Sequence, residues 1–129
     1  MLDTNILSDL IRNPQGKAAR RIARAGEDSV CTSIIVAAEL RYGCEKSGSA
    51  RLRRAVEDLL GEIEVLPLEA PADAGYAAIR ARLEAAGRPI GGNDLLIAAH
   101  ARALGAVIVT ANTAGFRRVR DVKVENWVG

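Results

Sequence analysis

Aromatic residues are scarce in this chain of 129 residues, which has one phenylalanine, two tyrosines and one tryptophan. Because hydrophobic residues still make up 49% of the sequence, small aliphatic side chains must fill most of the interior. A core of this kind suits helices packed on a sheet better than an all-β sandwich. The length fits one domain, residues 1–129, which can bury a core without disulfides or a structural metal.

Cysteine, histidine and long apolar segments are also rare. The two cysteines, Cys31 and Cys44, and the single histidine, His100, form no Cys/His pattern of the zinc-binding kind. No apolar run is long enough to span a bilayer, and the first residues lack the basic and apolar segments of a signal peptide. We therefore expect free thiols, no membrane segment and a cytoplasmic protein.

Positive and negative charges are nearly balanced, with a formal net charge of +2. The basic residues are mostly arginines, and these fall in clusters: Arg20, Arg21 and Arg24; Arg51, Arg53 and Arg54; Arg80 and Arg82; Arg117, Arg118 and Arg120. Guanidinium groups match the geometry of phosphate. For any one cluster, however, a solvated helix face is the simpler interpretation, so charge alone does not predict nucleic-acid binding.

Short apolar runs alternate with amphipathic stretches along the chain. Apolar spacing, capping residues, Pro and Gly predict helices over residues 4–11, 16–25, 34–46, 50–63, 70–86 and 93–104. Strands are expected at residues 1–2, 30–32, 64–68, 107–110 and 122–128, and a loop with one helical turn at 112–119. This alternation predicts an α/β fold with a mainly parallel central sheet flanked by helices.

Polar residues lie at the ends of three of these strands. Asp3 comes after the first strand, Ser33 comes after the second, and the segment 110–112 ends the fourth. In open parallel sheets, ligands bind beyond the carboxyl ends of the strands. These residues are therefore expected at one edge of the sheet.

Glu39 is the acid that is hardest to explain as structural. Its neighbours at helical spacing, Ile35, Val36, Tyr42 and Gly43, are interpreted as an apolar stripe, which would turn Glu39 towards the core side of its helix. A buried carboxylate needs a cation, a hydrogen-bond donor or a metal. A structural ion pair is an alternative, but a metal is favoured because the surrounding stretch is so apolar.

Asp3 and Asp94 each stand at the start of a predicted helix, so each has an alternative role as an N-cap, for which Asn93 competes with Asp94. Asp94 also follows a glycine-rich loop, which would direct it towards the open end of the sheet. A cluster of carboxylates from three segments is unstable without a cation, and oxygen ligands favour Mg²⁺ or Mn²⁺. Ions held in this way commonly serve phosphoryl chemistry.

Five segments, in order along the chain, resemble the motifs of PIN-domain nucleases. They are residues 1–5, Ser33 with 38–43, 93–101, 109–116 and 124–127. Each motif is weak by itself, but together they cover the whole chain at sensible spacing. In its size and in the residues of its motifs, the chain resembles the VapC toxins of bacterial toxin–antitoxin pairs, and FitB-like proteins are similar too.

This resemblance implies a Mg²⁺-dependent endoribonuclease, with Mn²⁺ as an alternative ion, that is inhibited by a small antitoxin which also binds operator DNA. Such toxins usually form homodimers and larger complexes with the antitoxin. Residues 87–91, Gly-Arg-Pro-Ile-Gly, resemble the subgroup that cuts initiator tRNA in the anticodon loop. A tRNA is therefore among the expected substrates.

The resemblance also implies roles for individual residues. The metal ligands would be Asp3, Glu39 and Asp94. Their hydrogen-bond partners would be Thr4, Asn5, Ser33 and Thr110. Arg88 would bind substrate phosphate, and Asn112 would complete the catalytic group.

Two positions depart from the family pattern. The fourth motif often has an acid where this chain has Asn112, and another acid is frequent where it has Gly115. Asn112 can offer a carbonyl oxygen or hold a metal-bound water, but it adds no negative charge. We therefore expect one metal to bind well and a second one poorly.

Two other functions are compatible with the sequence. A PIN domain that lost catalysis with the fourth acid would act as an RNA- or antitoxin-binding module. The strand–loop–helix pattern also permits a nucleotide-binding module, but no Gly-x-Gly-x-x-Gly follows a strand and no phosphate-loop lysine is present. His100 and Trp127 are expected in the core rather than on the substrate, and Tyr42 either lines the site or packs beside Glu39.

Overall fold

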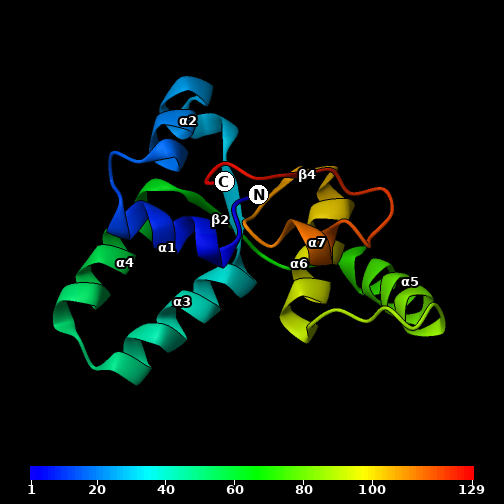
Figure 1. Ribbon diagram of the computed structural model, residues 1–129. Helices are drawn as coiled ribbons and strands as arrows, with labels where there is room; N and C mark the ends of the chain where they lie inside the picture. The colour runs from blue at the N-terminus through cyan, green and yellow to red at the C-terminus, as the bar shows by residue number, and fades with distance from the viewer.

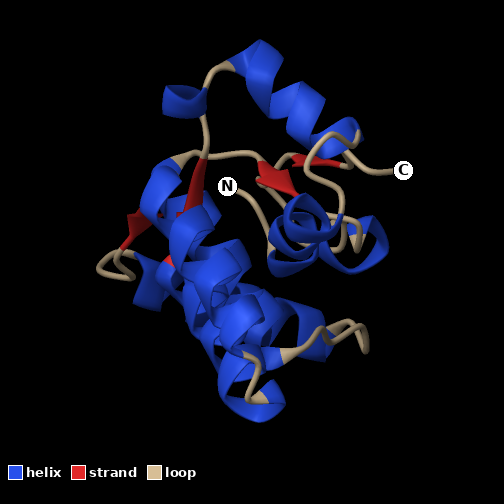
Figure 2. Cartoon of the chain, turned by 90° about the vertical axis from the view of Figure 1, so that its left-hand side faces the viewer, coloured by secondary structure: helices blue, strands red, loops and turns tan.

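A parallel sheet runs through the centre of the computed structural model, which describes all of residues 1–129 (Figure 1 and Figure 2). Its short strands are β1 (Cys31–Ser33), β2 (Glu64–Leu66), β3 (Ile108–Val109) and β4 (Val124–Glu125). β1 pairs with β2 and β3 pairs with β4, both in parallel. Leu2 forms parallel bridges to Thr32 and to Val109, so it joins the two pairs. The order across the sheet is β2, β1, Leu2, β3 and β4, which confirms the predicted α/β fold.

Seven α-helices surround the strands. They are α1 (Thr4–Arg12), α2 (Lys17–Ala25), α3 (Ile34–Ser47), α4 (Ala50–Glu62), α5 (Ala72–Ala85), α6 (Gly92–Leu104) and α7 (Thr113–Phe116). In Figure 1, α1 to α4 lie to the left of the N-terminal segment, and α5 to α7 lie to its right. Every predicted helix is present, with ends within two residues of the prediction. A short 3₁₀ turn, Glu27–Ser29, was not predicted.

The strands are shorter than the apolar runs suggested. The predicted strand 64–68 ends at Leu66, because Pro67 has no backbone N–H to continue a ladder. The predicted strand 122–128 is wrong over most of its length, since only Val124–Glu125 pairs. The Asn126 side chain accepts the backbone N–H groups of the last two residues, at 2.9 and 3.0 Å, and turns the chain end away from the ladder.

The helix caps show which of the two N-cap candidates, Asp3 and Asp94, caps a helix. Asp3 is the N-cap of α1, and its Oδ1 accepts the backbone N–H of Thr4 at 2.8 Å. The N-cap of α6 is Gly91, which makes no side-chain cap bond. Neither Asn93 nor Asp94 therefore caps this helix, so the capping alternative for Asp94 is wrong.

Aliphatic side chains fill the core, as the composition predicts. The large side chains that are fully buried include those of Phe116, Leu2, Ile6, Leu7, Ile79, Ile97 and Ile108. His100 is buried, as expected, whereas Trp127 is only partly buried at the edge of the core and donates from Nε1 to Glu125 at 3.0 Å. Both cysteines are free thiols. None of the helices has the length and apolar character needed to cross a bilayer.

Replacing Phe116 with alanine tests how the core holds α7. Phe116 is completely buried at the end of the helix that follows Asn112, so Phe116→Ala should lower the free energy of unfolding by about 3–5 kcal/mol. Urea denaturation followed by circular dichroism measures the loss. Leu104→Ala, at a position that is 51% exposed, is the control and should cost much less. Equal losses in the two variants would contradict this packing.

Candidate active site

Asp3 is the most buried acid of the candidate site, with only 5% of its surface exposed. The Thr110 hydroxyl donates to its Oδ2 at 2.8 Å, and the Asn5 amide donates to the same oxygen at 3.3 Å. The backbone N–H of Thr4 donates to Oδ1. Because both oxygens have donors, the carboxyl group is held in one orientation. Three of the four predicted hydrogen-bonding residues thus contact Asp3.

Asn5 and Thr110 tie two distant parts of the chain together beside Asp3. Asn5 Nδ2 donates to Thr110 Oγ1 at 3.2 Å, and Asn5 Oδ1 accepts the backbone N–H of Ala111 at 2.9 Å. Thr110 Oγ1 also accepts the backbone N–H of Asn112 at 2.9 Å. The part played by Ala111 was not predicted, and the sequence carries no signal for it because any residue but proline could supply that N–H.

Glu39 lies at the border of the buried face of α3, not at its centre. The buried residues of this helix are Val36, Ala37, Leu40 and Cys44. The predicted stripe is therefore wrong in part, since Tyr42 is 66% exposed and does not belong to the buried face. Residues 36, 40 and 44 recur every four positions and form the ridge that packs on the core. Glu39 is left half-buried beside this ridge.

Asp94 and Asn112 are joined across two helices. Asn112 is the N-cap residue of α7, and its Nδ2 donates to Asp94 Oδ2 at 3.3 Å. Gly115 lies against the same amide, because a Cβ built on it would meet Asn112 Nδ2 at 3.1 Å. The two departures from the family pattern are therefore in contact. In this arrangement Asn112 orients an acid and adds no charge of its own.

The three acids influence one another, and no basic side chain compensates them. Burial raises the pKa of Glu39, the charges of Asp3 and Asp94 raise it further, and the nearby Thr4 hydroxyl acts in the opposite direction without completing a hydrogen bond. Burial and the charge of Asp3 also raise the pKa of Asp94, and the Asn112 amide partly offsets this. All ion pairs of the chain lie elsewhere. The structure thus brings the three predicted acids together with their negative charge unpaired.

The chemistry of these groups suits a hard divalent cation. Carboxylate and amide oxygens are the donors that Mg²⁺ and Mn²⁺ prefer. The acids do not approach closely enough to form a group of three direct ligands around one ion. A cation held here would therefore complete its coordination with water, which Mg²⁺ readily retains.

Ser33 was expected to contact the acids, but it has a different partner. Its Oγ accepts the backbone N–H of Ile35 at 3.1 Å and lies 2.9 Å from Nδ1 of His100. Burial lowers the pKa of His100, against opposing effects of the Pro67 carbonyl and the Glu69 charge, so the neutral ring is favoured. The sequence did not predict this pair. Its signal is a polar residue that ends a strand together with a lone histidine in an apolar helix.

Arg88 is exposed on the loop between α5 and α6, and no ion pair holds its guanidinium. The Arg118 guanidinium donates to the Pro89 carbonyl at 3.0 Å, which ties this loop to the segment after α7. Arg118 is therefore partly used within the fold. Arg88 is free to meet an anion but contacts none of the acids.

Comparisons with known proteins agree on one family. Residues 1–122 match the family model of the PIN domain. The tRNA(fMet)-specific endonuclease VapC of Shigella flexneri is 40% identical over 128 residues, which cover 98% of this chain and 96% of that protein. The structure of VapBC2 from Rickettsia felis, bound to a promoter DNA fragment, aligns with a TM-score of 0.91 and 34% identity over 98% and 97% of the chains. FitAcB from Neisseria gonorrhoeae aligns with a TM-score of 0.83 and 29% identity over 97% and 95%.

Asp94→Asn should raise the melting temperature of the metal-free protein at neutral pH. The folded state raises the pKa of Asp94, so the ionised carboxylate destabilises the fold above that pKa, and this penalty fades as the pH falls through it. Asparagine keeps an oxygen that accepts the Asn112 bond but carries no charge. Thermal melts in chelator should show the gain at neutral pH and a smaller one in acid.

Asp58→Asn, an exposed change on α4, is the matched control and should show no such gain. An Asp94→Asn variant that melts below the wild type at neutral pH would contradict the electrostatic account of the site.

Proposed function

The chain belongs to the PIN-domain family and is a ribonuclease of its VapC type, and from this premise we propose that Asp3, Glu39 and Asp94 hold the cation at which RNA is hydrolysed. VapC-type PIN ribonucleases generally depend on a divalent metal. We infer Mg²⁺, with Mn²⁺ as an alternative, because the donors of the site are all oxygen atoms. Asn112 is the neutral fourth member of the catalytic group.

The observation that carries this proposal is the unpaired negative charge of the site. Asp3 and Asp94 lie close enough to raise the pKa of Glu39, and Asp3 also raises the pKa of Asp94. No lysine or arginine forms an ion pair with these carboxylates. Such a cluster destabilises the fold unless a cation joins it. A bound metal ion accounts for why these acids stand together.

Different residues of the chain would have different roles in the hydrolysis. A bound Mg²⁺ supplies a Lewis acid that polarises the scissile phosphate and lowers the pKa of an attacking water. In-line attack of water on phosphorus breaks the bond to the 3′ oxygen and leaves a 3′-hydroxyl and a 5′-phosphate. Asp3 is locked in orientation by its donors, and Asp94 is oriented by Asn112. Glu39, with its raised pKa, is suited to take the proton of the water at its carboxylate.

We propose a tRNA as the substrate and a cognate antitoxin as the protein partner of a toxin that acts as a homodimer in the cytoplasm. The Shigella flexneri relative is named for tRNA(fMet), and residues 87–91 resemble the initiator-tRNA subgroup. The solved relative from Rickettsia felis is a VapBC2 complex on promoter DNA. Arg88, exposed and without an ion-pair partner, would bind a phosphate of the substrate.

A second function is favoured by one observation, the amide at position 112. With Asn112 donating to Asp94 and Gly115 packed against that amide, no fourth acid strengthens the site. The chain would then be a catalytically weakened PIN domain that binds RNA or the antitoxin without turnover. Cleavage assays separate the two functions directly.

The wild-type protein should cut an initiator tRNA transcript in Mg²⁺ or Mn²⁺, and a chelator should stop the reaction. Asp94→Asn should abolish cleavage while circular dichroism stays unchanged, because the variant keeps the shape of the side chain and loses its charge. The products should carry 5′-phosphates. Elongator tRNA transcripts serve as the substrate control. Undiminished cleavage by Asp94→Asn, or cleavage in chelator, would contradict the site, and binding without turnover would favour the weakened domain.

Asn112→Asp should make the site bind metal more tightly. The change removes the donor to Asp94 and adds a fourth negative charge, so the half-maximal Mg²⁺ concentration for cleavage should fall, while the metal-free protein should melt at a lower temperature. Mg²⁺ titration of the cleavage rate and thermal melts measure the two effects. A variant that needs more Mg²⁺ than the wild type would show that position 112 does not face the ion.

A further inference from the structure

The basic face of α2 is a charged feature for which the cleavage site has no evident use. Lys17, Arg20, Arg21 and Arg24 recur at spacings of three and four residues, so they lie along one side of this nine-residue helix. All four are exposed, and the helix contains no acid. We use the name basic face for these four residues.

The other side of α2 holds the helix to the protein. Ala18 is fully buried and Ile22 packs partly buried against the core. The basic face therefore turns to solvent along a fixed helix. It forms a hollow of about 210 Å³ with the end of the chain, whose lining is completed by Asn126, Trp127 and Gly129.

Most of the positive charge on this face is unpaired. Arg21 alone has an acid partner, Glu125 at 3.5 Å, and its guanidinium also lies over the Trp127 ring, 5.2 Å from the centroid. Lys17, Arg20 and Arg24 take part in no ion pair. Like charges three and four residues apart on a helix repel one another, so a bound anion would relieve this repulsion.

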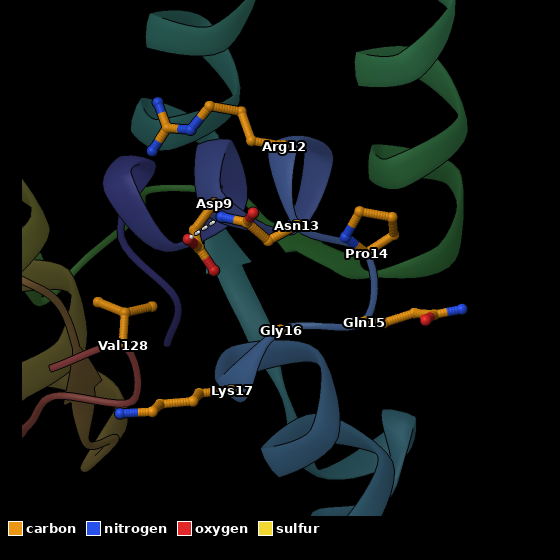
Figure 3. Close-up of a pocket in the computed structure, with 8 residues that line it drawn as sticks. All are labelled: Asp9, Arg12, Asn13, Pro14, Gln15, Gly16, Lys17 and Val128. Carbon is orange, nitrogen blue, oxygen red and sulfur yellow. Dashed lines mark hydrogen bonds between the residues drawn. The ribbon is translucent and has the colours of Figure 1, made fainter.

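The positive surface continues past the start of α2 into a second hollow, of about 550 Å³ (Figure 3). Lys17 lines both hollows and extends towards Val128 in the figure. The acid here is Asp9, whose carboxylate already accepts a bond from the Asn13 amide at 2.9 Å. The N-cap of α2 is Gly16, which makes no side-chain cap bond, and the other Asp9 oxygen lies 3.8 Å from a Cβ built on Gly16, so Asp9 already faces the positive end of this helix.

The basic face and the acids belong to different parts of the molecule, and neither hollow is lined by Asp3, Glu39 or Asp94. α2 leads through the 3₁₀ turn into the start of β1, whereas Asp3 and α3 follow strand ends. Figure 1 shows α2 at the top of the molecule, away from α3. An anion bound at α2 is therefore not the phosphate that is cut.

We propose that the basic face of α2 is a second RNA-binding surface, which holds backbone phosphates of a folded RNA at a distance from the cleaved bond. Four cations spread over seven residue steps of helix, about 10 Å, can face more than one phosphate. Guanidinium forks suit phosphate oxygens. A protein partner is disfavoured because the hollow has one apolar lining residue, Trp127, while the centres of protein interfaces are depleted of charge.

The test uses Lys17→Gln, Arg20→Gln and Arg24→Gln together, with Arg21 kept because it packs on Trp127. The matched control is Arg51→Gln with Arg54→Gln, which removes exposed arginines from α4 that form no ion pair. Binding is measured by fluorescence anisotropy over a range of salt, in the Asp94→Asn background, with a full initiator tRNA transcript. Cleavage of the isolated anticodon stem-loop is measured with proteins that keep Asp94.

The triple variant should weaken tRNA binding by about tenfold. It should also lower the slope of log Kd against the logarithm of the salt concentration by about 2–3, about one for each lost phosphate contact. Stem-loop cleavage and the control should be unchanged. An unchanged Kd and slope, or an equal loss in the control, would overturn the proposal. So would a loss of antitoxin affinity with RNA binding intact. Because binding is read without cutting, failure of the cleavage site and failure of this surface give different results.

Discussion

The position of Leu2 between β1 and β3 is the constraint on which the rest of the structure depends. Leu2 is fully buried, its N–H donates to the Cys31 carbonyl at 2.8 Å, and its own carbonyl accepts the Thr32 hydroxyl at 2.7 Å. On the other side, the Asp3 N–H donates to the Val109 carbonyl at 2.9 Å. These bonds hold the first residues in the middle of the sheet. Asp3 therefore emerges at the carboxyl edge, where α1 begins and β3 ends.

Charge is distributed unevenly around this sheet. The carboxyl edge carries three acids without basic partners, and the basic face lies on α2, away from the acid-bearing helix α3. A polyanion such as RNA is attracted to the basic face and repelled by the acids unless a cation is present. Glu39 and Asp94 lower the stability of the metal-free fold, because burial and neighbouring negative charge disfavour their ionised forms.

The local sequence pattern was sufficient to predict the fold class and the helices, because apolar spacing, capping residues and glycines determine a helix and its ends within a few residues. Pro67 marks the end of β2 in the sequence itself, but the other strand lengths were not predictable, since a ladder depends on partners far along the chain and on turns such as the one at Asn126. Asp3 and Asp94 were placed correctly by their positions after a strand and a glycine-rich loop. Glu39 was identified through a stripe that the structure corrects at Tyr42. Contacts that arise only in the folded chain, such as Asn112 with Asp94, left no local pattern, and for Ser33 with His100 the sequence shows the two polar residues but not that they meet.

The central claim is that the three acids share one divalent cation. Anomalous diffraction from crystals soaked in Mn²⁺ tests it most directly, because the scattering locates the ion without reference to activity. We predict one strong anomalous peak bounded by Asp3, Glu39 and Asp94, which an excess of Mg²⁺ removes and which Asp94→Asn crystals lack. An absent peak at this edge in fully soaked crystals, or a peak at another group of residues, would contradict the account.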